Sequence, residues 1–185
     1  MAKIHAQQDE IHLSLECLNS LIAADPLNPV AFAFRSLLFE GMENLDHAIN
    51  DLEQAVSDWP DEVKWRTKAA SLWRKYGNQK NALIQLESAY EIDPRDVEVV
   101  LELAQVCLDE KQPDRTIEYV KILTEENPNI YEAWEVLSEA YAMQGDMANA
   151  LAAAQRAGKI NTFSLKPYLM AGRIYLDSGD LDKAY

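Results

Sequence analysis

Prolines recur at a fixed interval of 34 residues along most of the chain. Pro26, Pro60, Pro94 and Pro128 form this series, and Thr162 occupies its next place. A period of this length indicates a repeat protein, in which each unit buries its apolar face only against its neighbours. The chain is therefore expected to fold as an array of similar units and not around one central core.

Small and apolar residues follow the same interval. Ala48, Ala82 and Ala150 stand in register, and so do Gly77 and Gly145. Between the prolines, apolar residues recur at spacings of three and four, which is typical of amphipathic helices. Each unit is therefore predicted to contain two helices, with the prolines marking helix ends.

Residues that favour helix starts stand at equivalent places in successive units. They are Asn44, Asn78, Gln112, Asp146 and Asp180 for the second helix, and Asn28, Asp96 and Ser164 for the first. Asn, Asp and Ser side chains accept hydrogen bonds from the free N–H groups of a first helical turn. Pro113, which follows Gln112, suits the first helical position. We therefore predict that helices begin just after these residues.

On these residues the chain resembles the tetratricopeptide repeat (TPR) proteins, whose 34-residue unit is an antiparallel helix pair. The clearest copy begins at Tyr131 and continues through Trp134, Leu137, Ser138, Tyr141, Gly145, Ala150 and Ala157. Earlier copies depart from the family pattern at Arg35, Arg66 and Thr116, where we expect weaker local packing. The resemblance implies an all-α fold, a right-handed superhelix of antiparallel helix pairs.

The register divides residues 1–185 into a single array. We expect a partial repeat at 1–28 that is mainly a second helix, full repeats at 29–62, 63–96, 97–130 and 131–164, and a truncated repeat at 165–185. A solenoid normally closes with a polar-faced capping element. Because neither end shows one, we expect either a piece of a longer array or end-to-end association between copies.

The resemblance also implies a binding surface. In the family, one stripe of the first helix of each repeat lines a concave groove that receives extended peptides or partner helices. The predicted contact residues are Phe34, Leu37, Lys64, Lys68, Ser71, Arg74, Glu98, Glu102, Gln105, Glu132, Glu135, Glu139, Lys166 and Arg173. This stripe is apolar in the first repeat, basic in the second, acidic in the third and fourth, and mixed in the fifth. We expect these blocks of charge to set the orientation of a bound partner.

A plainer interpretation of the stripe stays open. Its charges are then ordinary solvated residues, with Lys64, Lys68 and Glu102 paired across adjacent helices at little gain in stability. Phe34 and Leu37 would likewise contact an N-terminal helix.

Composition and motif content argue against several other functions. The net charge of −14 repels phosphate backbones and anionic lipid head groups. No apolar run approaches the roughly 18 residues of a membrane span. His5, His12 and His47 are scattered, and Cys17 and Cys107 are too few for a zinc site. No Gly-rich phosphate loop, GxSxG or CxxC motif occurs. We therefore expect no enzymatic activity, cofactor, metal, nucleic acid partner or membrane insertion.

The sequence favours a non-enzymatic protein–protein interaction scaffold that binds a peptide or helix of a partner protein in the concave groove. Two alternatives stay open. The array is the substrate-selecting or assembly arm of a larger enzyme, such as a glycosyltransferase, or it is a module that self-assembles into homo-oligomers through its uncapped ends. A start without a signal peptide favours the cytoplasm.

Overall fold

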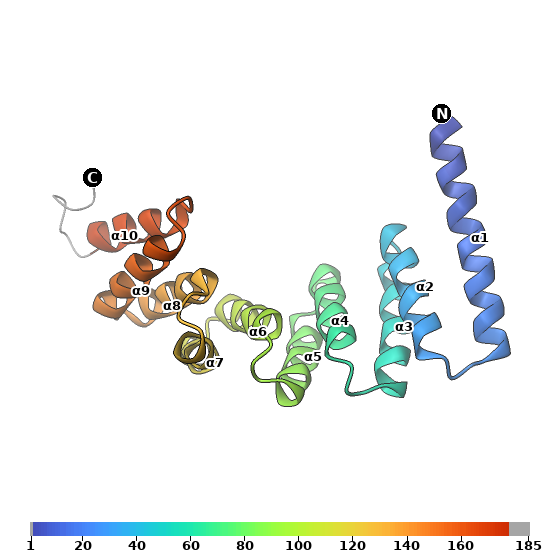
Figure 1. The fold of residues 1–185 in the computed structure, drawn as a ribbon, viewed down its shortest axis with the longest axis horizontal. Coiled ribbons are helices and arrows are strands. Elements are labelled where there is room, and N and C mark those ends of the chain that lie inside the picture. The colour runs from blue at the N-terminus through green and yellow to red at the C-terminus, as the bar shows by residue number, and fades with distance from the viewer. Residues whose placement is uncertain (1, 178–185) are drawn as a thin grey trace. The chain divides into compact units, whose positions relative to one another are not determined.

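The computed structural model describes residues 2–177, with side chains from Glu10 to Leu176. Within this range the chain forms ten α-helices and no strands (Figure 1). The helices are α1 (Ala2–Ala24), α2 (Pro29–Gly41), α3 (Leu45–Asp58), α4 (Val63–Tyr76), α5 (Gln79–Ile92), α6 (Val97–Asp109), α7 (Pro113–Glu126), α8 (Tyr131–Gln144), α9 (Met147–Ile160) and α10 (Lys166–Asp177). The fold is therefore all-α, as predicted. Asp180 lies outside the described residues.

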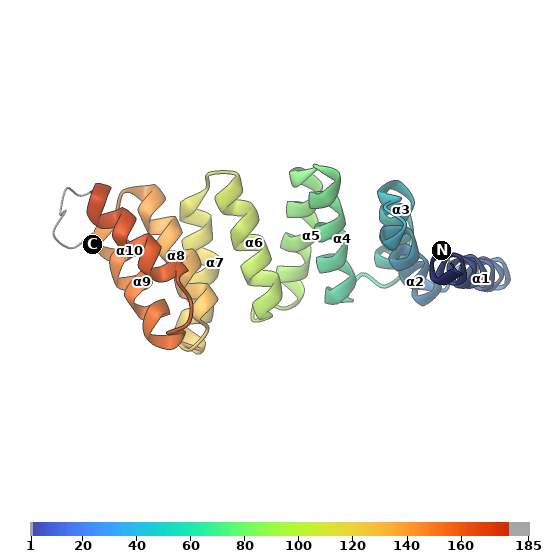
Figure 2. The same ribbon diagram turned by 90° about the horizontal axis from the view of Figure 1, so that it is seen from above.

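The helices group into two compact units, which divide between Asp93 and Pro94. In the N-terminal unit, α2 packs against α3 and α4 packs against α5, while α1 lies on α2 and α3 contacts α4. In the C-terminal unit, α6 pairs with α7 and α8 with α9, and α10 packs against α9. Figures 1 and 2 show these helix pairs side by side within each unit. In the C-terminal unit, α8 also contacts α6 and α10 directly.

The proline series marks helix ends, as predicted. Pro26, Pro60, Pro94 and Pro128 each lie two residues beyond the end of a helix, after α1, α3, α5 and α7. Thr162 has the same place after α9. Proline cannot continue a helix because it lacks the backbone N–H and disfavours helical geometry in the residue before it.

Most predicted helix starts are confirmed. The side chains of Asn28, Asn44, Asn78, Asp96 and Asp146 accept hydrogen bonds from the backbone N–H three residues later. Gln112 precedes α7 without a side-chain bond, and Pro113 is the first helical residue. The prediction for Ser164 is wrong, since α10 begins at Lys166. The Ser164 hydroxyl instead donates to Glu135 of α8 at 2.9 Å.

Small side chains let paired helices approach closely. Ala48, Ala82 and Ala150 are completely buried, and so is Thr116 at the equivalent place in α7. The Thr116 hydroxyl donates to backbone carbonyls of Ala104 and Gln112, at 3.4 and 3.2 Å. Thr116 therefore fits the helix interface with its polar group satisfied, and not as the weak point that we expected.

Arg66 also has partners at a place where the family pattern has a large apolar residue. Its Nε donates to the carbonyl of Pro60 at 2.7 Å. Trp134, two repeat intervals later, donates its indole N–H to the carbonyl of Pro128 at 2.9 Å. Arg66 thus reproduces the hydrogen bond that tryptophan makes at this position, which ties the helix to the preceding turn.

Candidate protein-interaction surfaces

An apolar pocket of about 540 Å³ lies between α1 and α2. Its apolar walls are Leu13, Cys17 and Leu18 from α1, and Phe34, Leu37 and Leu38 from α2. Phe34 is 57% exposed and Leu37 is 48% exposed. The two residues share this pocket with an N-terminal helix, yet α1 leaves about half of each side chain open to solvent.

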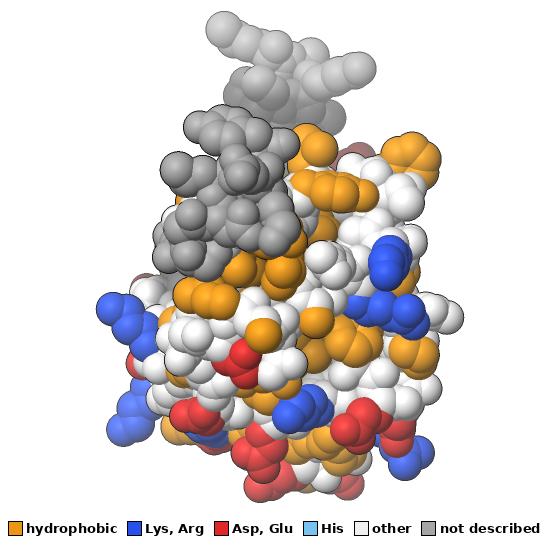
Figure 3. All heavy atoms as spheres, turned by 90° about the vertical axis from the view of Figure 1, so that its left-hand side faces the viewer, with side chains coloured by type: hydrophobic (Ala, Val, Ile, Leu, Met, Phe, Trp, Pro, Cys, Tyr) orange, Lys and Arg blue, Asp and Glu red, His pale blue; other side chains and the backbone are white. Residues whose placement is uncertain are grey.

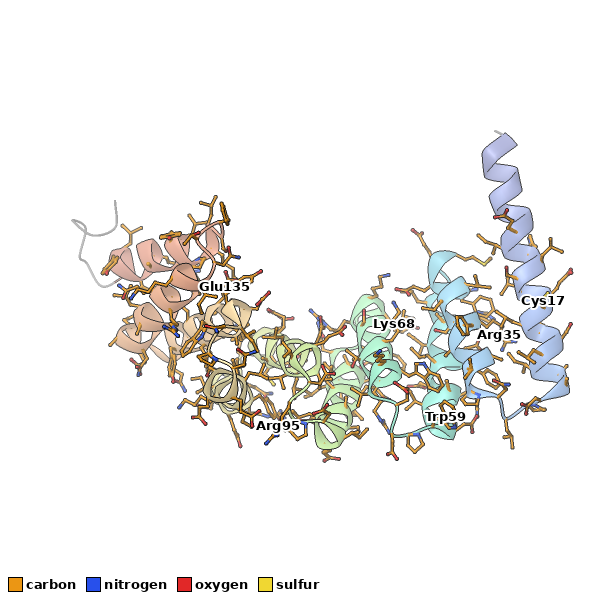
Figure 4. All side chains as sticks on the ribbon, viewed as in Figure 1. Cys17, Arg35, Trp59, Lys68, Arg95 and Glu135 are labelled. Carbon is orange, nitrogen blue, oxygen red and sulfur yellow. The ribbon has the colours of Figure 1, made fainter. Side chains whose placement is uncertain are left out.

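Arg35 joins α1 to the helix pair beneath it. Its Nη1 donates to Asn19 of α1 at 2.6 Å, and its Nε and Nη2 donate to Asp51 of α3. The hydrogen bonds to Asp51 raise the pKa of Arg35, although burial opposes this. The guanidinium also lies over the rings of Phe32 and Phe39. Figure 4 shows Arg35 between these elements and Cys17 on α1. Arg35 therefore fixes the α1 wall of the pocket.

A cluster of two lysines and one carboxylate joins α2 to α4. Glu40 lies 2.6 Å from the Lys68 ammonium and 2.8 Å from that of Lys75. Burial raises the pKa of Glu40, but the hydrogen bonds from the two lysines outweigh it, so the net pKa falls below the ordinary value of 4.5. Since one carboxylate serves two ammonium groups, the cluster keeps a positive charge. Lys64, one turn before Lys68, is exposed and adds to it.

The remaining predicted residues of α4 contribute less to this surface. Ser71 and Arg74 are half-buried, and Arg74 is already engaged within the fold. The pairing of Lys68 with Glu40 of a neighbouring helix agrees with the plainer interpretation of its charge.

On α6, the three predicted residues differ in how available they are. Glu98 is exposed, whereas Glu102 is half-buried and engaged within the fold. Gln105 donates to Asp109 of the same helix at 3.0 Å. Glu98 is therefore the predicted residue of this helix that stands most open to a partner.

Glu135 of α8 faces the connection to α10. It is 8% exposed, accepts a hydrogen bond from Ser164 and lies 3.7 Å from the Lys166 ammonium. Figure 4 shows Glu135 on the α10 side of α8. A partner cation could not reach this carboxylate without displacing those groups. Glu132, one turn earlier, is exposed, and its carboxylate accepts a hydrogen bond from the Tyr131 hydroxyl, which raises the pKa of that hydroxyl.

A second pocket, of about 510 Å³, lies between α8 and α10. Three predicted residues line it, namely Glu139 from α8 and Lys166 and Arg173 from α10. Methionines fill much of the remaining wall: Met143, Met147 and Met170. The structure thus brings Glu139, Lys166 and Arg173 to one place, with flexible thioether side chains between them.

The exposed side of α10 is apolar. Leu165, just before the helix, and Tyr168, Leu169 and Leu176 on it are more than half exposed. Figure 3 shows hydrophobic side chains gathered at this end of the C-terminal unit.

Two parts of these surfaces were not predicted from the sequence. The first is the wall that α1 contributes to the apolar pocket. The second is Glu40, which stands three residues after Leu37 on the same helix face. The sequence places Glu40 in the stripe, but it does not reveal that Glu40 pairs with two lysines of another helix.

Cys17 is exposed, and Cys107 is buried. Among the helices that the structure describes, none is long and apolar enough to cross a membrane. Across the same residues, no group of three or more His, Cys, Asp or Glu side chains could hold a metal ion.

Comparison with known proteins identifies relatives for part of the sequence. Residues 101–161 match the family model of the tetratricopeptide repeat. The chain is similar to Tetratricopeptide repeat protein 16 of Mus musculus, with 37% identity over 51 residues, which is 28% of this chain and 7% of that protein. The chain thus spans about 7% of the length of the curated relatives that it matches.

Solved structures share the fold. YrrB, described as a TPR protein with an unusual peptide-binding site, has a TM-score of 0.75 at 18% identity, over 92% of this chain and 88% of that chain. MamA from Desulfovibrio magneticus RS-1 has a TM-score of 0.77 at 14% identity, over 84% of this chain and 88% of that chain. Proteins with this fold generally act as non-catalytic scaffolds for protein interactions. Residues 101–161 therefore match the tetratricopeptide repeat family, and the helix pairs set at 34-residue intervals along the described residues share the fold of its solved members.

Proposed function

We propose that the chain is a non-enzymatic scaffold that captures a peptide or helix of a partner protein on the first helices of its repeats. One observation carries this proposal. In the N-terminal unit, the apolar pocket between α1 and α2 adjoins the Glu40 cluster, because Leu37 and Glu40 are neighbours on one face of α2. A hydrophobic anchor and a charge-selective contact therefore stand next to each other.

The charges of this surface favour an acidic partner segment. Lys68 and Lys75 share the single carboxylate of Glu40, and Lys64 is exposed beside them. A partner carboxylate can bind an ammonium that Glu40 alone does not neutralise. A leucine or phenylalanine of the same segment would enter the pocket beside Phe34, where burial of apolar surface supplies most of the binding free energy.

The C-terminal unit favours a partner of the opposite sign. Glu98 and Glu132 are exposed carboxylates on α6 and α8. Glu139 adds a further carboxylate beside Lys166 and Arg173 in the pocket between α8 and α10. Basic partner residues are the proposed ligands of Glu98 and Glu132.

A library of short random peptides displayed on phage tests the proposal. We expect the selected peptides to combine acidic residues with a large apolar residue. Because Cys107 is buried and Cys17 is exposed, a fluorescent maleimide will label Cys17 in the wall of the pocket. Binding of a selected peptide should then change the emission, and its affinity should fall as added salt screens the charges.

Two charge-reversal variants decide whether the first helices form the binding surface. Lys64→Glu with Lys68→Glu should weaken binding about tenfold, or about 1.4 kcal/mol. Lys80→Glu with Lys159→Glu makes the same change in net charge on exposed positions of second helices and should have little effect. Equal losses of peptide affinity in the two variants would show that the first helices do not form the binding surface. Unchanged thermal unfolding would show that both variants are folded.

Association between copies is a second candidate, which the apolar side of α10 favours. Leu169 and Leu176 are exposed there, about two helical turns apart. Sedimentation of the protein over a range of concentrations should show a rising mass that Leu169→Asp with Leu176→Asp abolishes. A constant monomer mass would exclude this candidate.

A further inference from the structure

A third pocket lies on a different side of the C-terminal unit, between two second helices. It has a volume of about 450 Å³ and is bounded by α7, α8 and α9. Its apolar part consists of Trp134, Leu137 and Tyr141 from α8 and Ala153 from α9. Because α8 packs against both α7 and α9, the pocket has α8 as its floor and the two second helices as its walls.

The alanines of α9 explain why a pocket forms at this place. At the position of Ala153, the earlier repeats carry Asp51, Gln85 and Tyr119. Asp51 fills its own helix interface by binding Arg35. A methyl group is much smaller than any of these side chains, so it leaves Trp134 half-buried with its ring accessible.

The chemistry of the pocket combines aromatic rings with two cations. The indole N–H of Trp134 is already donated to the carbonyl of Pro128, so its ring is available for apolar contact. Lys121 on α7 and Arg156 on α9 are exposed and line the two opposite walls. Among the side chains that the structure describes, neither the Lys121 ammonium nor the Arg156 guanidinium has a hydrogen bond or an ion pair. Glu125 is the one acidic residue in the lining that the structure describes.

The balance of charge at this pocket is opposite to that of the whole chain. Lys121 and Arg156 outnumber Glu125, in a chain with a net charge of −14. Attraction for negative charge at this pocket is therefore local, while the net negative charge of the chain repels long anions such as nucleic acid. This favours a short acidic segment over a polyphosphate chain. Tryptophan, tyrosine and arginine are also the residues that most often dominate the energy of protein interfaces.

We propose that this pocket is a second, independent binding site for an acidic segment of a partner protein. A large apolar or aromatic side chain of the segment seats between Trp134 and Tyr141. Carboxylates on either side of it bind Lys121 and Arg156. The site goes beyond the function proposed above, because it lies between two second helices and does not use the residues of the predicted stripe.

Fluorine NMR of protein labelled with fluorotryptophan tests this site directly. The chain has four tryptophans, and Trp134 alone of them lies in the C-terminal unit. The Trp134→Phe variant assigns its signal. The probe is a capped peptide with phenylalanine between acidic residues, added up to millimolar concentration. We expect it to shift the Trp134 signal with saturation, while Trp59, Trp65 and Trp73 report separately on any binding to the N-terminal unit.

Matched variants separate pocket binding from general charge attraction. Ala153→Tyr installs the side chain of Tyr119 and should abolish the shift, with Ala153→Gln as a milder filling. Arg156→Glu should weaken binding about tenfold, whereas Lys159→Glu, the same charge change on an exposed position of α9, should have little effect. An unchanged unfolding midpoint shows that each variant is folded.

Three results would overturn the proposal. They are the absence of a Trp134 shift at millimolar peptide, a shift that Ala153→Tyr does not reduce, and equal losses in Arg156→Glu and Lys159→Glu. A shift produced by a nucleoside triphosphate but not by the peptide would assign the pocket to a small anionic ligand instead. Because the readout is Trp134, failure here leaves the Cys17 result for the N-terminal unit unaffected.

Discussion

Arg35 of α2 and Asp51 of α3 form a two-point contact, in which the Nε and Nη2 groups of Arg35 each donate a 2.7 Å hydrogen bond to a different carboxylate oxygen. Their side chains are 19% and 9% exposed. At the same places, α8 and α9 carry Leu137 and Ala153, both buried. The same pair of repeat positions thus forms an ion pair in one repeat and an apolar contact in another.

Removal of one member of this pair should destabilise the N-terminal unit. Asp51→Ala leaves the guanidinium without its carboxylate, and loss of one partner of a buried pair costs about 3 kcal/mol or more. Urea unfolding, followed by the fluorescence of Trp65 and Trp73 in that unit, measures the change.

The double variant Arg35→Leu with Asp51→Ala is the matched control for this prediction. It reproduces the Leu137 and Ala153 contact, and replacement of a buried ion pair by apolar groups is often neutral. It should recover most of the lost stability. A double variant as unstable as Asp51→Ala would show that the position needs the charges themselves.

Two buried serines at equivalent positions should respond in opposite ways. Ser138 donates to the carbonyl of Ala150 at 2.8 Å, whereas the hydroxyl of Ser36 has no partner among the described residues. Ser138→Ala should cost about 1 kcal/mol, while Ser36→Ala should stabilise by a similar amount because it removes an unsatisfied polar group. Urea unfolding of each variant checks the signs, and the same sign for both would contradict the assigned hydrogen bonding.

The turns between paired helices contain a left-handed residue just before the second helix. The positions are Glu43 with φ 59°, Gly77 with φ 87°, Lys111 with φ 57° and Gly145 with φ 82°. A side chain in this conformation costs about 1 kcal/mol or more. Since glycine also gains entropy when unfolded, Glu43→Gly and Lys111→Gly should each stabilise by about 0.5 kcal/mol, as measured by thermal unfolding.

Gly77→Ala supplies the converse test. A Cβ at this position would meet no heavy atom within 4 Å, so its cost is conformational and not steric. The variant should lose about 1 kcal/mol of stability. A gain in stability from Gly77→Ala would contradict the positive φ.

Stability of the N-terminal unit should depend on the ionisation of Glu40. Its pKa is lower when folded than its ordinary value of 4.5, because Lys68 and Lys75 donate to the carboxylate. The ion pairs therefore stabilise the unit above pH 4.5, and this contribution is lost as the pH falls through the folded pKa. Since the lysines are partly exposed, the effect should be at most about 1 kcal/mol. Denaturant unfolding across this pH range measures it.

The variant Glu40→Gln removes the titrating group and gives the control. It should be slightly less stable than the parent at neutral pH and should show a flatter dependence between neutral pH and acid. An NMR titration of the Glu40 carboxyl carbon locates the folded pKa itself. A value above 4.5 would contradict the assigned pairing with the lysines.

The sequence by itself determined the features that depend on nearby residues. Asn44 and Asp146 form helix starts because the capping hydrogen bond joins groups three residues apart. Pro60 and Pro128 mark helix ends because the missing N–H acts on the backbone around it. These effects act within one turn of helix, so the order and approximate bounds of the helices could be predicted from spacing alone.

Only the tertiary structure decided which side chains meet. Glu40 and Lys75 are 35 residues apart, and their contact depends on how α2 lies against α4. The burial of Glu135 under Ser164 likewise depends on the path of the connection into α10. Side chains on the predicted stripe share one direction along each helix, but rotamers and distances between helices determine whether a charge pairs within the fold or stays open to a partner. Whether a charge is paired or open therefore follows from the packing between helices. The repeat interval alone does not specify that packing for an individual pair of side chains.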